Sequence, residues 1–123
     1  MTCRIRIAAL SLGVLCVLAA PSLSFAAPPI AMLWSIPDHS TKTGDPYSYA
    51  TTWEIQNPSC YAGHQFTLTQ KPAGMTVNSS GVISWNPATP AGYYTITVRL
   101  TGYSDCIGIG NSVQNRTYTL NVC

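Results

Sequence analysis

The chain is 123 residues long, 46% hydrophobic and only 8% charged, with a formal net charge of +2. This length suits one domain with a single modest core. After residue 26, four basic residues balance four acidic residues, so the chain offers no clustered basic face for the phosphates of a nucleic acid. Composition and charge therefore exclude a nucleic-acid binder that relies on such a face.

The first 26 residues have the pattern of a signal peptide. Two arginines precede an apolar run at residues 7–20, and a Ser-x-Ala site for signal peptidase ends at Ala26. The apolar run is shorter than the roughly 20 residues of a membrane span. We therefore expect residues 1–26 to be removed, a mature domain at residues 27–123 without a membrane span, and a secreted or periplasmic location.

Alternating apolar and polar residues predict short β-strands along the rest of the chain. The clearest series runs from Tyr94 to Leu100, where every second residue is apolar and threonine fills most of the positions between them. Turn residues separate such runs about every ten positions. We expect strands near residues 30–36, 46–56, 64–70, 75–78, 81–85, 93–102 and 115–122. This pattern predicts an all-β fold, an antiparallel sandwich of about seven strands.

Three motifs in the middle of the chain carry a resemblance to a known family. They are Pro-Ala-Gly-Met-Thr-Val at 72–77, Gly-Val-Ile-Ser-Trp-Asn-Pro at 81–87 and Ala-Gly-Tyr-Tyr-Thr-Ile-Thr-Val at 91–98. With these motifs the chain resembles the putative immunoglobulin-like domains of secreted bacterial proteins, relatives of the dystroglycan-type cadherin-like module. The resemblance covers most of residues 28–122 and implies an immunoglobulin-like or cadherin-like sandwich. It departs at residues 53–65, where relatives often carry an acidic turn.

Several residues of these motifs have a structural reason to be present. Gly74 and Gly81 suit tight turns that need positive φ, and Trp85 alternates with Ile83, which favours a core position over a sugar-stacking platform. A tyrosine at the start of a strand, such as Tyr94, commonly ties a sandwich corner to the backbone. The expected fold-defining residues are Gly74, Gly81, Ile83, Trp85, Pro87, Gly92 and Tyr94.

Three cysteines follow the predicted signal peptide: Cys60, Cys106 and Cys123. In an oxidising compartment this number predicts at least one disulfide and one remaining thiol. In an immunoglobulin-like sandwich the loops that hold Cys60 and Cys106 emerge at the same end, so the resemblance implies that these two pair. Cys123 is then a free thiol or links to a partner, including a disulfide-linked dimer.

Metal and catalytic sites have little support in the sequence. Cadherin-like kinship suggests calcium, but the four acids are scattered and the acidic turn is missing, so we expect no cofactor and no tight calcium site. Cys60 and His64 could form a nucleophile–base pair oriented by Asp38, yet no catalytic signature surrounds them. A zinc site that combines Cys60, His64, Cys106 and His39 has no known ligand spacing. We expect a protein that is not an enzyme and holds no metal.

Two functions suit such a domain. Four aromatic residues assigned to loops are candidates for stacking on a ligand: Trp53, Tyr61, Tyr93 and Tyr103. Aromatic surfaces with few charges suit neutral sugars, so the first hypothesis is an exported, non-catalytic binding or adhesion module for a carbohydrate or protein at the cell surface. The second is a structural accessory subunit that joins a partner protein by an edge strand or by Cys123. Because sandwiches host many functions, the fold does not choose between them.

Overall fold

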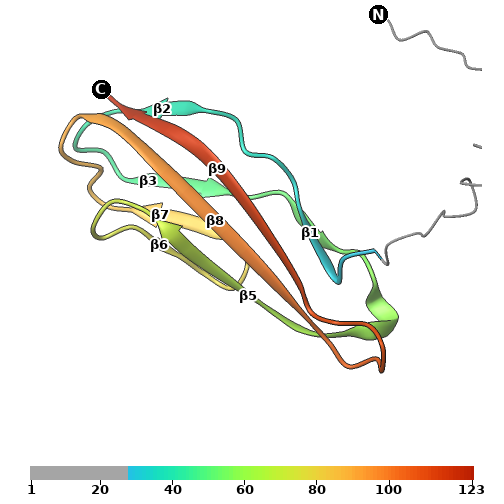
Figure 1. Cartoon of the computed structure of the whole chain (residues 1–123). Coiled ribbons are helices and arrows are strands. Elements are labelled where there is room, and N and C mark those ends of the chain that lie inside the picture. The colour runs from blue at the N-terminus through green and yellow to red at the C-terminus, as the bar shows by residue number, and fades with distance from the viewer. Residues whose placement is uncertain (1–27) are drawn as a thin grey trace, which may run out of the picture.

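Two facing β-sheets form this protein, whose structure is a computed structural model that describes residues 28–123 (Figure 1). The larger sheet has the order β2-β9-β8-β5, with strands His39–Thr41, Ser112–Val122, Gly92–Ser104 and Tyr61–Gln70. The smaller sheet has the order β3-β7-β6, with strands Tyr47–Ala50, Val82–Trp85 and Thr76–Val77. A separate pair joins β1, Ala31–Leu33, to β4, Trp53–Ile55. The predicted all-β sandwich is confirmed. The expected signal peptide, residues 1–26, lies outside the described residues.

Residues 28–123 form nine strands where the sequence pattern predicts about seven. The predicted strand at 46–56 is divided, because the chain leaves the smaller sheet after Ala50 and pairs with β1 from Trp53 onward. At the break, Thr51 is buried, and its backbone N–H and side-chain hydroxyl both donate to the carbonyl of Gly81. The short polar strand β2 was not predicted, because three residues are too few to show the alternation of apolar and polar residues that indicates a strand.

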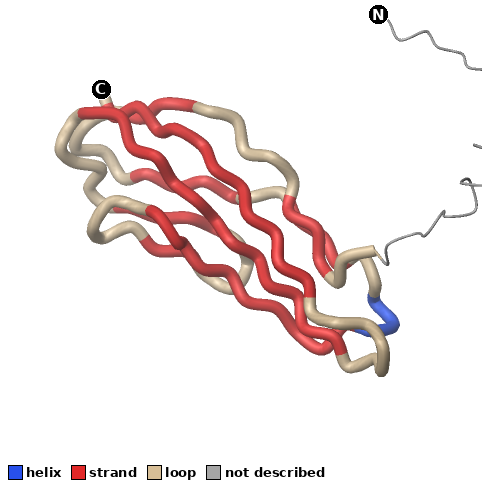
Figure 2. The backbone as a smooth tube through the Cα atoms, viewed as in Figure 1, coloured by secondary structure: helices blue, strands red, loops and turns tan. Residues whose placement is uncertain are grey.

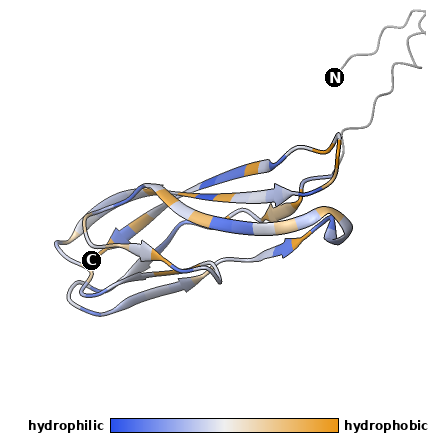
Figure 3. Ribbon diagram, turned by 90° about the horizontal axis from the view of Figure 1, so that it is seen from below, coloured by the Kyte–Doolittle hydropathy of each residue, from blue (hydrophilic) through white to orange (hydrophobic). Residues whose placement is uncertain are grey.

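Strands dominate the described backbone, and its single helical segment is a 3-10 turn, η3, at Pro58–Cys60 (Figure 2). Hydrophobic and hydrophilic residues alternate along the long strands (Figure 3). In β8, Ile96, Val98 and Leu100 are fully buried between the sheets, whereas Arg99 is exposed on the outer face. Burial of such side chains is the main source of stability for a domain of this size. Within residues 28–123 no helix is long and apolar enough to cross a membrane.

Gly102 of β8 allows β1 to lie directly on the larger sheet. A Cβ atom at this position would lie 2.8 Å from the Cβ of Ile30 and 3.1 Å from the backbone nitrogen of Ala31. Since real Cβ atoms do not approach so closely, any other residue would push β1 away. A glycine inside a strand often marks a close backbone approach of this kind.

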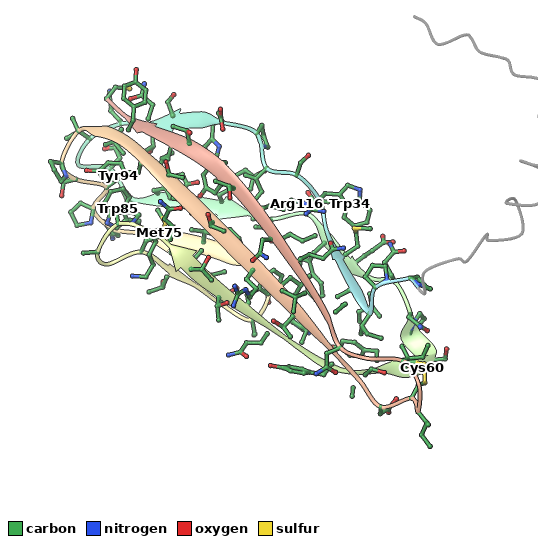
Figure 4. All side chains as sticks on the ribbon, in the orientation of Figure 1. Trp34, Cys60, Met75, Trp85, Tyr94 and Arg116 are labelled. Atoms are coloured by element: carbon green, nitrogen blue, oxygen red, sulfur yellow. A yellow bond between two sulfur atoms is a disulfide. The ribbon has the colours of Figure 1, made fainter. Side chains whose placement is uncertain are left out.

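Two of the residues expected to define the fold, Trp85 and Tyr94, lie at the end of the sandwich opposite Cys60 (Figure 4). Ile83 and Trp85 are buried in the core, and the indole of Trp85 meets the ring of Tyr94 edge-on at 5.1 Å. The Tyr94 hydroxyl donates to the carbonyl of Pro90, which ties the start of β8 to the preceding turn. The turn glycines Gly74, Gly81 and Gly92 all have positive φ, and Pro87 follows the end of β7.

Candidate binding surface

A disulfide closes one end of the sandwich. The sulfur atoms of Cys60 and Cys106 are 1.98 Å apart and their Cα atoms 5.2 Å apart, which joins η3 to the turn between β8 and β9. The predicted pairing is confirmed. Cys123 is exposed at the opposite end and forms no disulfide with the described cysteines (Figure 1). We refer to the region of Cys60 and Cys106 as the disulfide end.

The four aromatic residues proposed for stacking lie in strands rather than loops, and they do not form one surface. Trp53 belongs to β4, Tyr61 begins β5, and Tyr93 and Tyr103 lie on β8. Ten residues separate the two β8 tyrosines, which is about 33 Å along a strand. Tyr93, 78% exposed, therefore lies far from the disulfide end and cannot share a small ligand with Tyr103.

Trp53 and Tyr61 are engaged in packing around His64. The Trp53 indole N–H donates to the carbonyl of Ser80 at 3.0 Å, and its ring lies 4.5 Å from the His64 ring. The Tyr61 hydroxyl lies 2.6 Å from Nδ1 of His64, whose Nε2 is 2.7 Å from the carbonyl of Ser79. These contacts fasten β4 and β5 to the turn between β6 and β7, so both rings have a structural role.

Tyr103 lies on the outer face of the larger sheet with polar and apolar neighbours. Its hydroxyl donates to the Gln65 side-chain oxygen at 2.8 Å, and its ring covers Gly63, where a Cβ atom would lie 3.8 Å from it. Thr101 pairs with Gln65 on one side and with Val113, 55% exposed, on the other. We name these four residues, Gln65, Thr101, Tyr103 and Val113, the Tyr103 face.

The Tyr103 face has the chemistry of a small neutral binding surface. It combines an aromatic ring and an aliphatic side chain with one hydroxyl and one amide, and none of its four members is charged. The bond to Gln65 holds the Tyr103 ring in one orientation, which reduces the entropy lost when a ligand orders it. Arg99, the charged residue of β8, donates a hydrogen bond from Nε to the Asn115 side-chain oxygen at 3.2 Å. The arrangement can accept apolar ring faces and exchange hydrogen bonds with hydroxyls.

His39 is the centre of a second aromatic cluster, on the β2 side of the sandwich. Its Nδ1 lies 2.8 Å from the carbonyl of Pro37, and its Nε2 lies 2.7 Å from the Tyr47 hydroxyl, which is 2.9 Å from the Tyr118 hydroxyl. Burial raises the pKa of Tyr118 to about 12, although its hydrogen bond with Tyr47 acts in the opposite direction. Burial, followed by the bond to Tyr118, raises the pKa of Tyr47 even further.

The suggested catalytic and zinc residues are engaged in other bonds. Cys60 and Cys106 are bonded to each other, so neither is available as a thiolate nucleophile or ligand. Both ring nitrogens of His39 and of His64 have hydrogen-bond partners within the chain. Among residues 28–123, no group of three histidine, cysteine or acidic side chains could hold a metal ion.

The sequence profile of the family described as Putative Ig domain matches residues 28–123, which is every residue that the structure describes. The chain belongs to the Putative Ig domain family. A comparison with curated protein sequences found no match. The family and the observed sandwich agree, so the resemblance that the central motifs suggest is confirmed.

Solved structures also share the fold of this Ig domain. One belongs to a putative alpha-galactosidase from Bacteroides fragilis, with a TM-score of 0.54 and 17% identity over 82% of this chain. Another belongs to a putative alpha-galactosidase/melibiase from the same organism, with a TM-score of 0.53 and 11% identity over 77% of this chain. The matches cover only 19% and 18% of those chains. At these identities the similarity shows the fold alone.

Sequence reasoning missed three of the four residues of the Tyr103 face of this Ig domain. Gln65, Thr101 and Val113 come from three strands, and only the register of β5, β8 and β9 makes them neighbours. Val113 alone carries a local signal, since it is an apolar residue at an outward position of an alternating strand.

Proposed function

We propose that this chain is an exported, non-catalytic Ig-like module that binds a neutral carbohydrate on the Tyr103 face. The observation that carries the proposal is the Tyr103 ring, oriented by Gln65 within a group of four uncharged residues on the outer face of the larger sheet. Sugar rings present apolar C–H faces that pack on aromatic rings, and their hydroxyls exchange hydrogen bonds with groups such as those of Thr101 and Gln65. Adhesion to a glycosylated cell surface would follow from the same chemistry.

The similar solved structures support a link to carbohydrate. Their names describe putative alpha-galactosidases, and the region similar to this chain is about a fifth of each of those proteins. A segment of that size with a sandwich fold suits an accessory domain rather than a complete enzyme. The disulfide also holds η3 and the β8–β9 turn beside the Tyr103 face, which stiffens its surroundings.

A glycan array probed with the full chain tests the proposal, followed by calorimetry with the glycan that binds best. Tyr103→Ala should weaken binding at least about tenfold, which corresponds to about 1.4 kcal/mol. Tyr93→Ala is the matched control, because it removes an exposed tyrosine from the far end of the same strand and should leave affinity unchanged. An array without a bound neutral glycan, or equal losses in the two variants, would refute the proposal.

Export is the second element of the proposal, to a secreted or periplasmic location. The signal-peptide pattern of residues 1–26 supports it, and the disulfide between Cys60 and Cys106 suits an oxidising compartment. Intact-mass measurement of protein collected outside the cytoplasm should give a chain that begins at Ala27. A mass that retains residues 1–26 would contradict this.

A second candidate function is that of an accessory subunit bound to a partner protein at the cell surface. The edge position of β5 in the larger sheet supports this role, because edge strands can pair with a strand of another chain. The exposed Cys123 offers another connection, including a disulfide-linked dimer. Non-reducing electrophoresis of the exported protein, compared with Cys123→Ser, tests that connection.

A further inference from the structure

The two long outer edges of the larger sheet differ in how they are protected. On the β9 edge, β2 covers residues 120–122, and the Asp38 carboxylate accepts the backbone N–H of Thr119 at 2.9 Å. The Arg116 guanidinium donates to the carbonyl of Asn115 at 2.8 Å. Several backbone groups of this edge, at Asn115 and at residues 119–122, are thus occupied within the chain, which hinders pairing with a foreign strand.

The β5 edge has none of this protection. β5 is the last strand of the larger sheet, ten residues long, and Tyr61–Gln70 contains no lysine, arginine, acid or proline. Register shifts occur at 61–63 and 68–70, but residues 64–68 pair one to one with β8. Outside the strand ladders, no backbone hydrogen bond of the described chain involves residues 64–68. Five regular residues, about 16 Å, are therefore open to an added strand.

A shallow, open groove lies beside this edge, between β5 and the short edge strand β6. Its volume is about 360 Å³, and its lining is Phe66, Thr67, Leu68, Lys71, Met75, Thr76 and Val77. Phe66 and Met75 are buried at its base, and Leu68 and Val77 are half-buried. The groove thus provides apolar contacts beside backbone groups that can form hydrogen bonds.

We infer that an extended segment of a partner protein adds to β5 as an antiparallel strand and places alternate apolar side chains in the groove between β5 and β6. Main-chain hydrogen bonds to residues 64–68 give such a complex its affinity, and pockets for every second side chain give it selectivity. Antiparallel pairing is slightly more stable per residue than parallel pairing. The inference specifies the second candidate function and shares only Gln65 with the Tyr103 face, which uses the side chain of that residue, whereas an added strand uses the backbone of residues 64–68.

Charge complementarity defines one end of the added segment. Lys71 is the single charged residue in the lining of the groove, and it follows the carboxyl end of β5. An antiparallel strand has its amino-terminal end at this position. The partner segment therefore begins with an acidic residue and continues with alternating apolar and polar residues.

Titration of the isotope-labelled full chain with a defined peptide tests the inference by NMR. The probe is an acetylated and amidated heptapeptide with aspartate first, followed by alternating valine and threonine; a second peptide has lysine in place of the aspartate. The expected result is a saturable change in the amide shifts of residues 64–68, slower hydrogen exchange there, and about threefold tighter binding of the aspartate peptide at low salt.

Charge reversal provides the matched comparison. Lys71→Glu should invert the preference so that the lysine peptide binds more tightly, whereas Lys42→Glu, in an exposed position outside the groove, should leave it unchanged. Tyr103→Ala should leave peptide binding intact, so a failure of the sugar proposal is distinguishable from a failure of this one. The inference is overturned if the peptides cause no change at β5 or act on another surface. It is equally overturned if a second copy of the chain already occupies the edge, which would appear as a dimer in light scattering together with slow hydrogen exchange at residues 64–68 in the absence of peptide.

Discussion

His39 and His64 both use their two ring nitrogens for hydrogen bonds, but their partners differ in burial. His39 contacts Tyr47 and Tyr118, which are 5% and 1% exposed, whereas His64 contacts the half-buried Tyr61 and Trp53. A buried hydroxyl that loses its hydrogen-bond partner is left without any partner, because water cannot reach it, and this destabilises the folded state. An exposed hydroxyl forms a hydrogen bond with water instead. The two clusters therefore look alike as hydrogen-bond patterns but differ in how strongly they stabilise the fold.

The two histidines also require opposite tautomers when neutral. A carbonyl oxygen can only accept, so His39 donates from Nδ1 to Pro37 and accepts from Tyr47 at Nε2. His64 donates from Nε2 to Ser79 and accepts from Tyr61 at Nδ1. In the His39 cluster the Tyr47 hydroxyl donates its single proton to His39, so it accepts a hydrogen bond from the Tyr118 hydroxyl. Three consecutive hydrogen bonds, from Pro37 through His39 and Tyr47 to Tyr118, therefore link β2 to the core. Two hydrogen bonds of His64, to Tyr61 and Ser79, fasten the turn between β6 and β7.

The largest expected effect comes from removing the disulfide beside the His64 cluster. The bond closes a loop with a sequence separation of 46, for which chain entropy predicts a stabilisation of up to about 4 kcal/mol. Cys60→Ser with Cys106→Ser should lower the urea midpoint strongly and leave the β-sheet circular dichroism in place. Hydrogen exchange should accelerate around His64 more than around His39. Cys123→Ser is the control and should change none of these; equal acceleration at both histidines would contradict a local effect of the disulfide on the His64 cluster.

Alanine replacement of each histidine measures the comparison directly. His39→Ala interrupts the bond chain to two buried tyrosines and should cost about 2 kcal/mol of unfolding free energy. His64→Ala releases half-exposed partners that water can satisfy, and should cost about 1 kcal/mol. Urea unfolding with a common m-value gives both numbers. A larger loss for His64→Ala would show that packing against Trp53 outweighs the buried hydroxyls.

Alkaline pH should affect the His39 cluster through Tyr118. A tyrosine ionises at about 10 in the unfolded chain, and the pKa of Tyr118 in the folded chain is raised to about 12. Since the folded state holds this proton more tightly, the stabilisation is complete below pH 10 and is lost as the pH rises toward 12. The urea midpoint should therefore fall between these values, less steeply in Tyr118→Phe. Identical slopes for the two proteins would contradict the burial of this hydroxyl.

Calcium should have the smallest effect on the stability of the protein. Asp38 is committed to the backbone N–H of Thr119, and Glu54 accepts from the side chain of Gln56, so neither acid is grouped with others. A site filled a hundredfold above its dissociation constant would add about 2.7 kcal/mol, which raises the melting temperature by several degrees. We expect less than about 1 °C in millimolar calcium, with magnesium as the control. A larger, calcium-specific rise would reveal oxygen ligands from backbone and amides.

Local sequence patterns are enough to predict which residues of the long strands face the core. Alternation from Tyr94 to Leu100 follows from the two-residue period of a strand, and the same period places Trp85 and Ile83 in the core. The positive φ at Gly74 and Gly81 is likewise a local requirement of turns. Family resemblance added the pairing of Cys60 with Cys106, because it supplied the end of the sandwich at which both loops emerge.

Contacts between side chains of different strands are seen only in the folded chain. Gln65 and Tyr103 are 38 positions apart, and Tyr47 and Tyr118 are 71 apart, yet each pair shares a hydrogen bond. Strand periodicity reports the face on which a residue lies but not the neighbouring strand or its register, and a shift of one residue would reverse every face. The same limit applies to the edges: only the sheet order leaves β5 outermost and brings Asp38 and β2 to β9. Contacts between strands depend on how the whole chain packs, which no local pattern contains.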